Sequence, residues 1–329
     1  MSILVCGGAG YIGSHCVYEL INSGYDVVIV DNLQTGHMDA VHEDAKFYKG
    51  DIRDKQFLNQ VFKKENIDAV IHFAANSIVG ESMTDPYKYY DNNVVGTLTL
   101  LDVMKEMKID KIVFSSTAAV YGEPENIPIL ETDKTTPTNT YGETKLTMEK
   151  MFKWFDVAHH IKYISLRYFN VAGAYYTGEI GEDHHPETHL IPLVLQVPLG
   201  KRDYISIFGE DYDTPDGTCI RDYIHVSDLS RAHILALEKL LAGSASDIFN
   251  LGNGEGFSVK EIIEAARNVT GHKIPARIES RRSGDPAKLV ASNKKAKECL
   301  GWEIVYKSVE AIIESAWKWH QNNPKGFKN

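Results

Sequence analysis

The chain has 329 residues, which is enough for one large domain or two closely packed domains. Hydrophobic residues make up 43% and charged residues 24%, as in folded globular proteins, which excludes disorder as the main state. The formal net charge is −10 and the sequence has no basic run, which argues against nucleic acid and membranes as partners.

The sequence does not read as a membrane or secreted protein. Its longest mostly apolar stretch, His189–Leu199, is interrupted by Pro192, Gln196 and Pro198, whereas a membrane span needs about 20 residues. A strand-like run stands at the start, so we expect no signal peptide and a cytoplasmic location. The four cysteines form no C-x-x-C pair, which favours reduced thiols over a zinc site or disulfides.

The first half of the chain alternates strand-like and helix-like segments. Apolar residues have helical spacing between the strands, as at Ile12, Cys16 and Leu20. Because parallel strands need long crossovers, this alternation predicts a doubly wound parallel sheet of the Rossmann type over residues 1–170. The predicted strands are Ile3–Cys6, Asp26–Val30, Lys46–Gly50, Ala69–Phe73, Lys111–Ser115 and Tyr163–Tyr168.

The second half has longer irregular stretches rich in Gly, Pro and Asp. Helices are predicted at Val226–Leu241, Ser258–Thr270 and Ser308–Asn322. No repeat or flexible linker separates the halves, so we expect a smaller C-terminal α/β domain, residues 171–329, that forms a cleft with the first. We expect residues 222–243 to pack back on the first domain.

A glycine-rich loop, Gly7–Gly13, follows the first strand and opens a helix with the pattern G-x-x-G-x-x-G. Such a loop lets the backbone approach a pyrophosphate at a helix N-terminus. Asp31, at the end of the second strand, would bind the ribose hydroxyls of a dinucleotide. Because Asp31 would repel a 2′-phosphate and Asn32 follows it instead of an arginine, the sequence favours NAD over NADP. Asp51, Ile52, Phe73, Ala74 and Ala75 follow later strands, where ligands of such sheets bind.

Tyr141 and Lys145 form a Y-x-x-x-K pattern on one helix face, just after the possible helix cap Asn139. A phenol acts as a base near neutral pH only if a cation stabilises its phenolate, and Lys145 can supply that charge. Ser115 and Thr117 bring hydroxyls to the end of the fifth strand. Together with the glycine-rich loop, these residues form the signature of an extended short-chain dehydrogenase/reductase.

The chain resembles the UDP-glucose 4-epimerase family over essentially its full length. The resemblance rests on the motifs above and on Arg167–Asn170, Arg221–Val226 and Arg281–Asp285. It implies reversible 4-epimerisation of UDP-glucose and UDP-galactose through a 4-keto sugar, with tightly bound NAD. It also implies that the first domain binds NAD and that residues 171–329 mainly bind the sugar nucleotide.

The resemblance also implies roles for single residues. Tyr141 would take the proton from the sugar 4-hydroxyl, Lys145 would hold the nicotinamide ribose, and Thr117 would bind the reacting oxygen. The implied cofactor-binding residues are Gly7, Gly10, Tyr11, Ile12, Gly13, Asp31, Asn32, Asp51, Ile52, Phe73, Ala74, Ala75, Asn93, Ser115, Tyr141, Lys145 and Tyr168. The implied substrate-binding residues are Thr117, Tyr141, Asn170, His189, Leu190, Ser206, Ile207, Phe208, Arg221, Arg282, Asp285 and Leu289.

Within the substrate set, Arg221 and Arg282 would clamp the diphosphate, Asp285 would contact the nucleotide ribose, and Ser206–Phe208 would lie against uracil. Leu289 stands at a position that lines the pocket near the sugar 2-substituent. Because Leu is smaller than a tyrosine, we expect the N-acetylated sugars UDP-GlcNAc and UDP-GalNAc to be accepted as well.

The sequence departs from the family pattern at two positions. Ser77 stands where a lysine often reaches the cofactor, and His189 stands where an asparagine commonly binds the substrate phosphates. Two questions therefore stay open: how tightly the loop that contains Ser77 binds NAD, and what role His189 has.

Three other functions fit the sequence less well than epimerisation. The histidines of Glu182–His189 could suggest a metal site, but Pro186 occupies the place of the glutamate in H-E-x-x-H, so no metal is expected. A sugar-nucleotide dehydratase usually has an Asp-Glu pair after Thr117, where this chain has two alanines. A non-catalytic dinucleotide binder would need neither Tyr141 nor Lys145.

The segment Asn93–Met107 predicts a homodimer. It carries Val94, Leu98 and Leu101 on one face and Leu100, Val103 and Met107 on another, and the helix after Tyr141 adds Trp154. A helix that is apolar on two faces needs two partners, and pairing across a two-fold axis would bury the second face.

Overall fold

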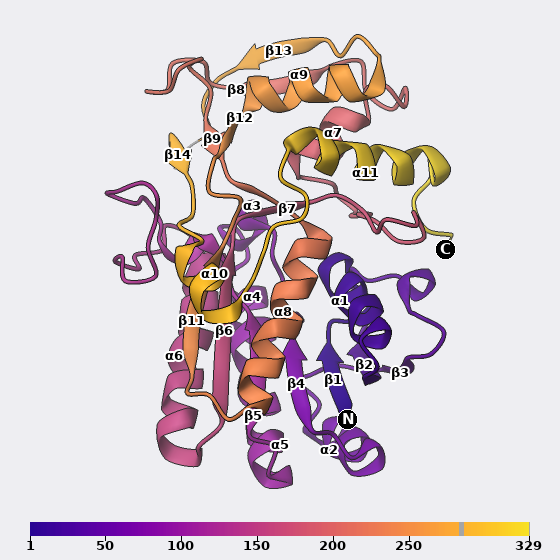
Figure 1. The fold of residues 1–329 in the computed structure, drawn as a ribbon, viewed down its shortest axis with the longest axis vertical. Helices are drawn as coiled ribbons and strands as arrows, with labels where there is room; N and C mark the ends of the chain where they lie inside the picture. The colour runs from indigo at the N-terminus through magenta and orange to yellow at the C-terminus, as the bar shows by residue number, and fades with distance from the viewer. Residues whose placement is uncertain (283–285, 329) are drawn as a thin grey trace.

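The strands predicted in the first half of the chain form one parallel sheet, as the computed structural model shows for residues 1–282 and 286–328 (Figure 1). Within these residues the sheet has seven strands in the order β11-β6-β5-β4-β1-β2-β3, and every neighbouring pair is parallel. The predicted doubly wound fold is confirmed. The strands are β1 (Ser2–Cys6), β2 (Asp26–Asp31), β3 (Lys46–Lys49), β4 (Ala69–His72), β5 (Lys111–Ser115), β6 (Lys162–Tyr168) and β11 (Asp247–Leu251).

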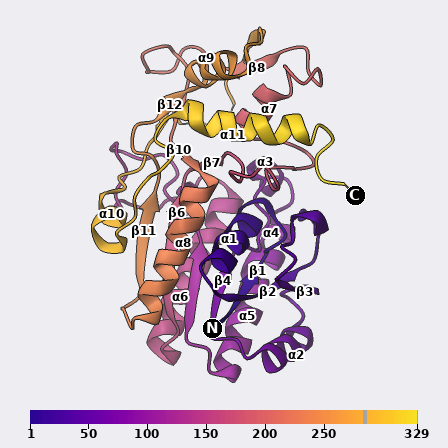
Figure 2. The same ribbon diagram turned by 45° about the vertical axis from the view of Figure 1, so that its right-hand side comes forward.

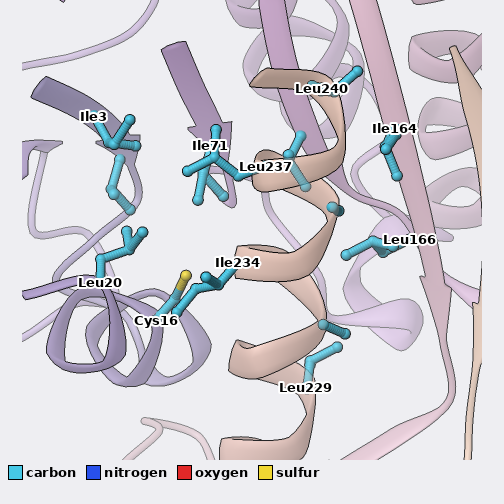
Figure 3. Close-up of a cluster of buried hydrophobic side chains, with 14 of the residues drawn as sticks. Ile3, Cys16, Leu20, Ile71, Ile164, Leu166, Leu229, Ile234, Leu237 and Leu240 are labelled. Atoms are coloured by element: carbon cyan, nitrogen blue, oxygen red, sulfur yellow. The ribbon is translucent and has the colours of Figure 1, made fainter. Parts of the chain in front are cut away.

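Helices cover both faces of this sheet, which explains why its strands are apolar on both sides. In β1, Ile3 and Val5 join one buried cluster, whereas Leu4 and Cys6 join the other. The first cluster packs against α1 (Tyr11–Asn22), α8 (Val226–Leu241) and α10 (Lys294–Leu300), and the second against α2 (Lys55–Glu65), α5 (Gly96–Met107) and α6 (Thr140–His159). In Figure 3, Ile234 and Leu237 of α8 lie between Cys16 of α1 and Leu166 of β6.

The strand order reverses at β1, which pairs with β2 on one side and β4 on the other. In open α/β sheets a ligand crevice forms outside the carboxyl ends of the strands at such a point. The loops after β1 and β4 meet here, since the backbone N–H groups of Phe73 and Ala74 both donate to the carbonyl oxygen of Cys6 at 2.8 and 2.9 Å.

A smaller lobe, called here the upper lobe, lies above these carboxyl ends in Figure 1. Its helices pack around a core of their own, and Figure 2 shows α11 crossing above the ends of α8 and α1. Its helices are α7 (Leu190–Leu195), α9 (Val259–Thr270) and α11 (Val309–Asn322). Its strand groups are β7 (Asn170–Ala172) with β10 (Tyr223–His225), β8 (Ile205–Phe208) with β13 (Ala276–Glu279), and β12 (Phe257–Ser258) with β9 (Ile220–Arg221) and β14 (Lys288–Leu289).

The part of the second half that returns to the sheet is longer than the expected residues 222–243. Helix α8 packs against α1 and the sheet, but β11 also joins the sheet beside β6. Phe249 and Leu251 of β11 are fully buried in the same cluster as α8, so burial of these side chains draws the strand into the sheet.

The predicted single helix over Asn93–Met107 is divided in the structure. A π-helical segment, η2 (Tyr90–Val95), precedes α5, and Leu101 is fully buried together with Leu100. Leu101 therefore does not belong to a second, outward face, whereas Leu98 is exposed. The remaining short helices are η1 (Met38–Ala40), α3 (Val79–Ser82), α4 (Pro86–Tyr89) and η3 (Ala118–Val120). Among the described residues, no helix has the length and apolar character to cross a membrane.

Candidate active site

A cavity of about 460 Å³ lies at the carboxyl edge of the sheet and is lined by residues of both lobes. Most of the residues predicted from the sequence line it. They are Gly7, Gly10, Tyr11, Ile12, Gly13, Asp31, Asn32, Ile52, Phe73, Ala74, Ala75, Ser115, Thr117, Tyr141, Lys145, Tyr168, Asn170, His189 and Leu289.

The glycine-rich loop forms a cradle that side chains would fill. Gly7 has a φ of +83°, and a Cβ there would lie 2.6 Å from the backbone nitrogen of Ala74. A Cβ on Gly13 would lie 2.0 Å from the carbonyl oxygen of Gly7. Gly10 is the N-cap of α1 and has no side chain to bond the first N–H groups of that helix. The loop therefore fits the pyrophosphate of a dinucleotide.

Asp31 is held rigidly at the end of β2. Its two oxygens accept hydrogen bonds from the backbone N–H groups of Ala9 at 3.0 Å and Leu33 at 2.8 Å. Burial raises the pKa of the Asp31 carboxyl, and these two hydrogen bonds oppose that rise. The side chain lines the cavity where a ribose of NAD would lie if the pyrophosphate occupies the glycine cradle.

Asp51 does not line the cavity, although its neighbour Ile52 does. Its oxygens accept hydrogen bonds from Arg53 at 2.7 and 2.8 Å and from Asn32 at 3.2 Å. The hydrogen bonds from Arg53 lower the pKa of Asp51 to about 2. The carboxylate therefore holds the side chain of Asn32, which does line the cavity.

Strand β5 and helix α6 bring the predicted catalytic residues together. The Asn139 side chain accepts a hydrogen bond from Gly142 N at 2.9 Å, which confirms the predicted helix cap. One turn further along α6, the side chain of Lys145 extends to the end of β5, where its Nζ donates a hydrogen bond to the carbonyl oxygen of Ser115 at 2.8 Å. Tyr141 and Thr117 both line the cavity, and the Thr117 hydroxyl favours the phenolate form of Tyr141 against the rise in pKa that burial causes.

The electrostatics of Tyr141 and Lys145 follow from their burial. Tyr141 is 9% exposed and Lys145 is 2% exposed. Burial raises the pKa of Tyr141 to about 12, against the opposing effect of the Thr117 hydroxyl. Burial lowers the pKa of Lys145 to about 7, while the nearby carboxylate of Glu149 opposes that change. Tyr141 can therefore act as a base at neutral pH only with positive charge close to it.

Tyr168 and Asn93 support the cavity in different ways. The Tyr168 hydroxyl is hydrogen-bonded to Ser115 Oγ, and the ring forms part of the wall. Asn93 is fully buried behind the wall. Its side chain binds the backbone N–H and carbonyl oxygen of Asn76, at 2.8 and 3.1 Å, and so holds the loop that presents Ser77 to the cavity.

The residues expected to bind UDP are only partly brought to the cavity. Leu190 packs against the core of the upper lobe. The Arg282 guanidinium lies 4.0 Å from the centre of the Phe208 ring, and Arg221 Nη1 donates to the carbonyl oxygen of Ile220 at 2.8 Å. Asp285 lies outside the described residues. The residues that do not line the cavity are Leu190, Ser206, Ile207, Phe208, Arg221 and Arg282.

A sequence model described as the NAD-dependent epimerase/dehydratase family matches residues 3–252. This chain belongs to that family. A curated UDP-glucose 4-epimerase of Halalkalibacterium halodurans is 61% identical over 327 residues, covering 99% of this chain and 98% of the relative.

Solved structures agree with the family assignment. A crystal structure of a UDP-glucose 4-epimerase is 63% identical, with a TM-score of 0.98 and full coverage of both chains. Another, from Bifidobacterium longum in complex with NAD⁺ and UDP, is 41% identical, with a TM-score of 0.94 over 99% of this chain and 100% of that one.

Several cavity residues of this family member were not predicted. The polar ones among them include Asn76, Asn92, Glu182 and His184, and further backbone and apolar positions also line the cavity. His184 belongs to the histidine-rich run Glu182–His189, in which the sequence predicted a cavity residue only at His189. The unpredicted lining residues are Val30, Gln34, Thr35, Gly50, Asn76, Ser77, Val79, Asn92, Ala118, Ala119, Gly122, Thr138, Asn139, Phe169, Val171, Glu182, His184 and Pro286.

Proposed function

We propose that this chain interconverts UDP-glucose and UDP-galactose by reversible epimerisation at C4, with NAD as a tightly bound cofactor. The observation that carries the proposal is that Tyr141, Thr117 and Lys145, all buried, line the same cavity as the glycine cradle. Relatives named UDP-glucose 4-epimerase match nearly the whole chain.

The chemistry divides between the cofactor and the side chains. When bound beside the glycine loop and Lys145, NAD would supply reversible hydride acceptance at C4, so the overall reaction is redox neutral. Tyr141 accepts the proton of the 4-hydroxyl and returns it to the product, while Thr117 orients the reacting oxygen. Lys145, fixed by Ser115, supplies positive charge that stabilises the phenolate.

Other sugar-nucleotide epimerases and dehydratases of the same superfamily form the alternative. A dehydratase must protonate and expel the 6-hydroxyl, which needs an acid and a base beside the sugar. Ala118 and Ala119 follow Thr117, where a dehydratase usually has its acid pair, and they line the cavity with methyl groups. This favours simple epimerisation.

The test is to incubate the purified chain with UDP-galactose and no added NAD, and to follow UDP-glucose by chromatography. We expect UDP-glucose to form while free NADH does not accumulate. A failure to form UDP-glucose even after NAD is supplied would refute the proposal. The Tyr141→Phe variant is the matched control, because it removes one oxygen and leaves the cavity intact.

Leu289 supports a wider substrate range. It lines the cavity and is only partly buried against the cluster that contains Ala118 and Phe169. A leucine at this place leaves more room than an aromatic ring, so the proposal includes UDP-GlcNAc and UDP-GalNAc as substrates. In this scheme residues 1–170, with the returning helix α8, hold NAD, and residues 171–329 mainly hold the UDP-sugar.

A homodimer and a cytoplasmic location complete the proposal. Helices α5 and α6 pack against each other, and large apolar side chains stand exposed on both: Val95 just before α5, Leu98 on it, and Trp154 and Val157 on α6. A second copy placed across a two-fold axis would cover this surface. The four cysteines are free thiols, as in proteins of reducing compartments.

A further inference from the structure

The loop between β7 and α7 gathers two histidines and two glutamates at one point. The ligand atoms of Glu182, His184, Glu187 and His189 all lie within 4.8 Å of one another. His185, which the sequence pairs with His189 at helical spacing, is not part of this group. Its ring is 73% exposed and lies 3.3 Å from Asp183. We call the four residues the Glu/His cluster.

The distances within the Glu/His cluster match a small coordination sphere. Glu182 Oε1 lies 2.9 Å from His189 Nδ1 and 3.2 Å from His184 Nδ1. Glu187 lies 2.9 Å from His189 Nδ1 and 3.7 Å from His184 Nδ1. Tetrahedral zinc with bonds of about 2.0–2.2 Å separates neighbouring ligand atoms by roughly 3.3–3.5 Å. Three of the four distances are shorter than this separation and one is longer.

Burial supplies a second, independent observation. The side chains of Glu182 and Glu187 are only 4% and 8% exposed. Among the described residues, Glu182 Oε1 and His184 Nδ1 are both buried without a well-aligned hydrogen bond, although they face each other. Without an ion, protonated His184 and His189 balance the two carboxylates: against the lowering effect of burial, the glutamates raise the pKa of His184 to about 9 and that of His189 to about 10. A divalent cation at the point on which the four ligand atoms converge would replace these two protons and keep the buried charges balanced.

We propose that the Glu/His cluster binds one divalent transition-metal ion of the Zn²⁺ class, with His184 Nδ1, His189 Nδ1 and an oxygen of each glutamate as ligands. Nitrogen and carboxylate ligands in a four-coordinate site suit Zn²⁺, and four protein ligands make the site structural instead of catalytic. The proposal departs from the expectation of no metal, which considered only the helical H-E-x-x-H pattern. The inference does not depend on the proposed epimerase activity.

The ion would fix the wall of the cavity. Its ligands span the loop that enters α7, and the His184 ring lies 6.0 Å from that of Tyr11, at the start of α1. Coordination through Nδ1 leaves Nε2 of His189 as a fixed N–H donor on the opposite side of a ring that lines the cavity. A bound metal would thus give His189 one tautomer and one orientation towards the substrate.

The test uses the full chain with its cofactor, stripped of metal by a chelator and freed of any affinity tag. Zn²⁺ is added, excess ion is removed, and the metal content is measured by mass spectrometry. We expect about one Zn²⁺ per wild-type chain and a melting temperature raised by about 4 °C at Zn²⁺ concentrations near 100 Kd. The double variant His184→Gln/Glu187→Gln should lose both effects.

The matched control is His185→Gln, which changes the adjacent histidine outside the Glu/His cluster and should bind Zn²⁺ like the wild type. Co²⁺ provides a check on the wild-type chain alone, because tetrahedral coordination gives intense visible absorption. The proposal is overturned if the wild type retains no Zn²⁺, if the double variant retains as much as the wild type, or if His185→Gln abolishes binding.

Discussion

Replacing Lys145 with alanine tests whether its charge makes Tyr141 a usable base. Lys145 Nζ lies 5.9 Å from the centre of the Tyr141 ring, and both side chains are buried. If this ring-centre distance is taken as the separation of the two charges, with an effective dielectric constant near 20, the attraction between ammonium and phenolate is about 3 kcal/mol, or about two pKa units. Loss of the charge should therefore raise the phenol pKa by about two units.

The expected result is an upward shift of the pH optimum. Below the phenol pKa, the phenolate fraction falls tenfold per unit, so kcat near neutral pH should fall about 100-fold. The ammonium itself is present below the Lys145 pKa of about 7 and is lost as the pH rises through that value, so the variant should differ from the wild type most at low pH. At high pH the difference should shrink.

The assay follows UDP-glucose formation from UDP-galactose between about pH 6 and pH 10. Bound NAD is measured in each sample, because Lys145 also carries a predicted contact with the cofactor. Lys153→Ala, an exposed lysine on the same helix, is the control and should keep the wild-type profile. An unchanged pH profile in an active, NAD-loaded Lys145→Ala variant would refute the electrostatic argument.

Four further outcomes are expected. Tyr141→Phe should retain NAD but lose about 10²–10⁴-fold in kcat, and retention of substantial activity would assign the proton transfer to another group. Glu149→Gln should lower the free energy of unfolding by about 3–5 kcal/mol in chemical denaturation, because it breaks a 2.5 Å ion pair with Arg167 in which both side chains are 4% exposed. Leu289→Tyr should lower kcat/KM for UDP-GlcNAc more than for UDP-glucose, and equal effects on the two sugars would remove Leu289 as the selecting residue. Trp154→Glu should convert a dimer into a 36.9 kDa chain in sedimentation at micromolar concentration, whereas a wild type that already sediments as a monomer would contradict the homodimer.

The sequence alone determined those features of this protein that arise from residues close together in the chain. Strand and helix periodicities recur within a few residues, so the six strands of the first half and three helices of the second, α8, α9 and α11, were predicted to within a residue or two, whereas the shorter α7 and α10 were not predicted. The glycine loop, Asp31 and the Tyr141–Lys145 pair were found in the same way. Each lies next to an element whose end fixes its place at the carboxyl edge of the sheet.

Tertiary structure decided what depends on contacts between distant segments. Strand β11 joins the sheet because the cluster under α8 buries Phe249 and Leu251, although β11 lies about 80 residues beyond its partner β6. The Asn93 side chain bonds to the backbone of Asn76 and does not line the cavity, and the Arg282 guanidinium stacks on the Phe208 ring.

The Glu/His cluster shows the same limit most clearly. Helical spacing pairs His185 with His189, but the loop between β7 and α7 is not a helix there, so its path brings His184 to His189 and turns His185 outward. Local spacing predicts neighbours only where the backbone has a regular period. In an irregular loop the packing of the surrounding chain decides which side chains meet, and here it places two histidines against two buried carboxylates.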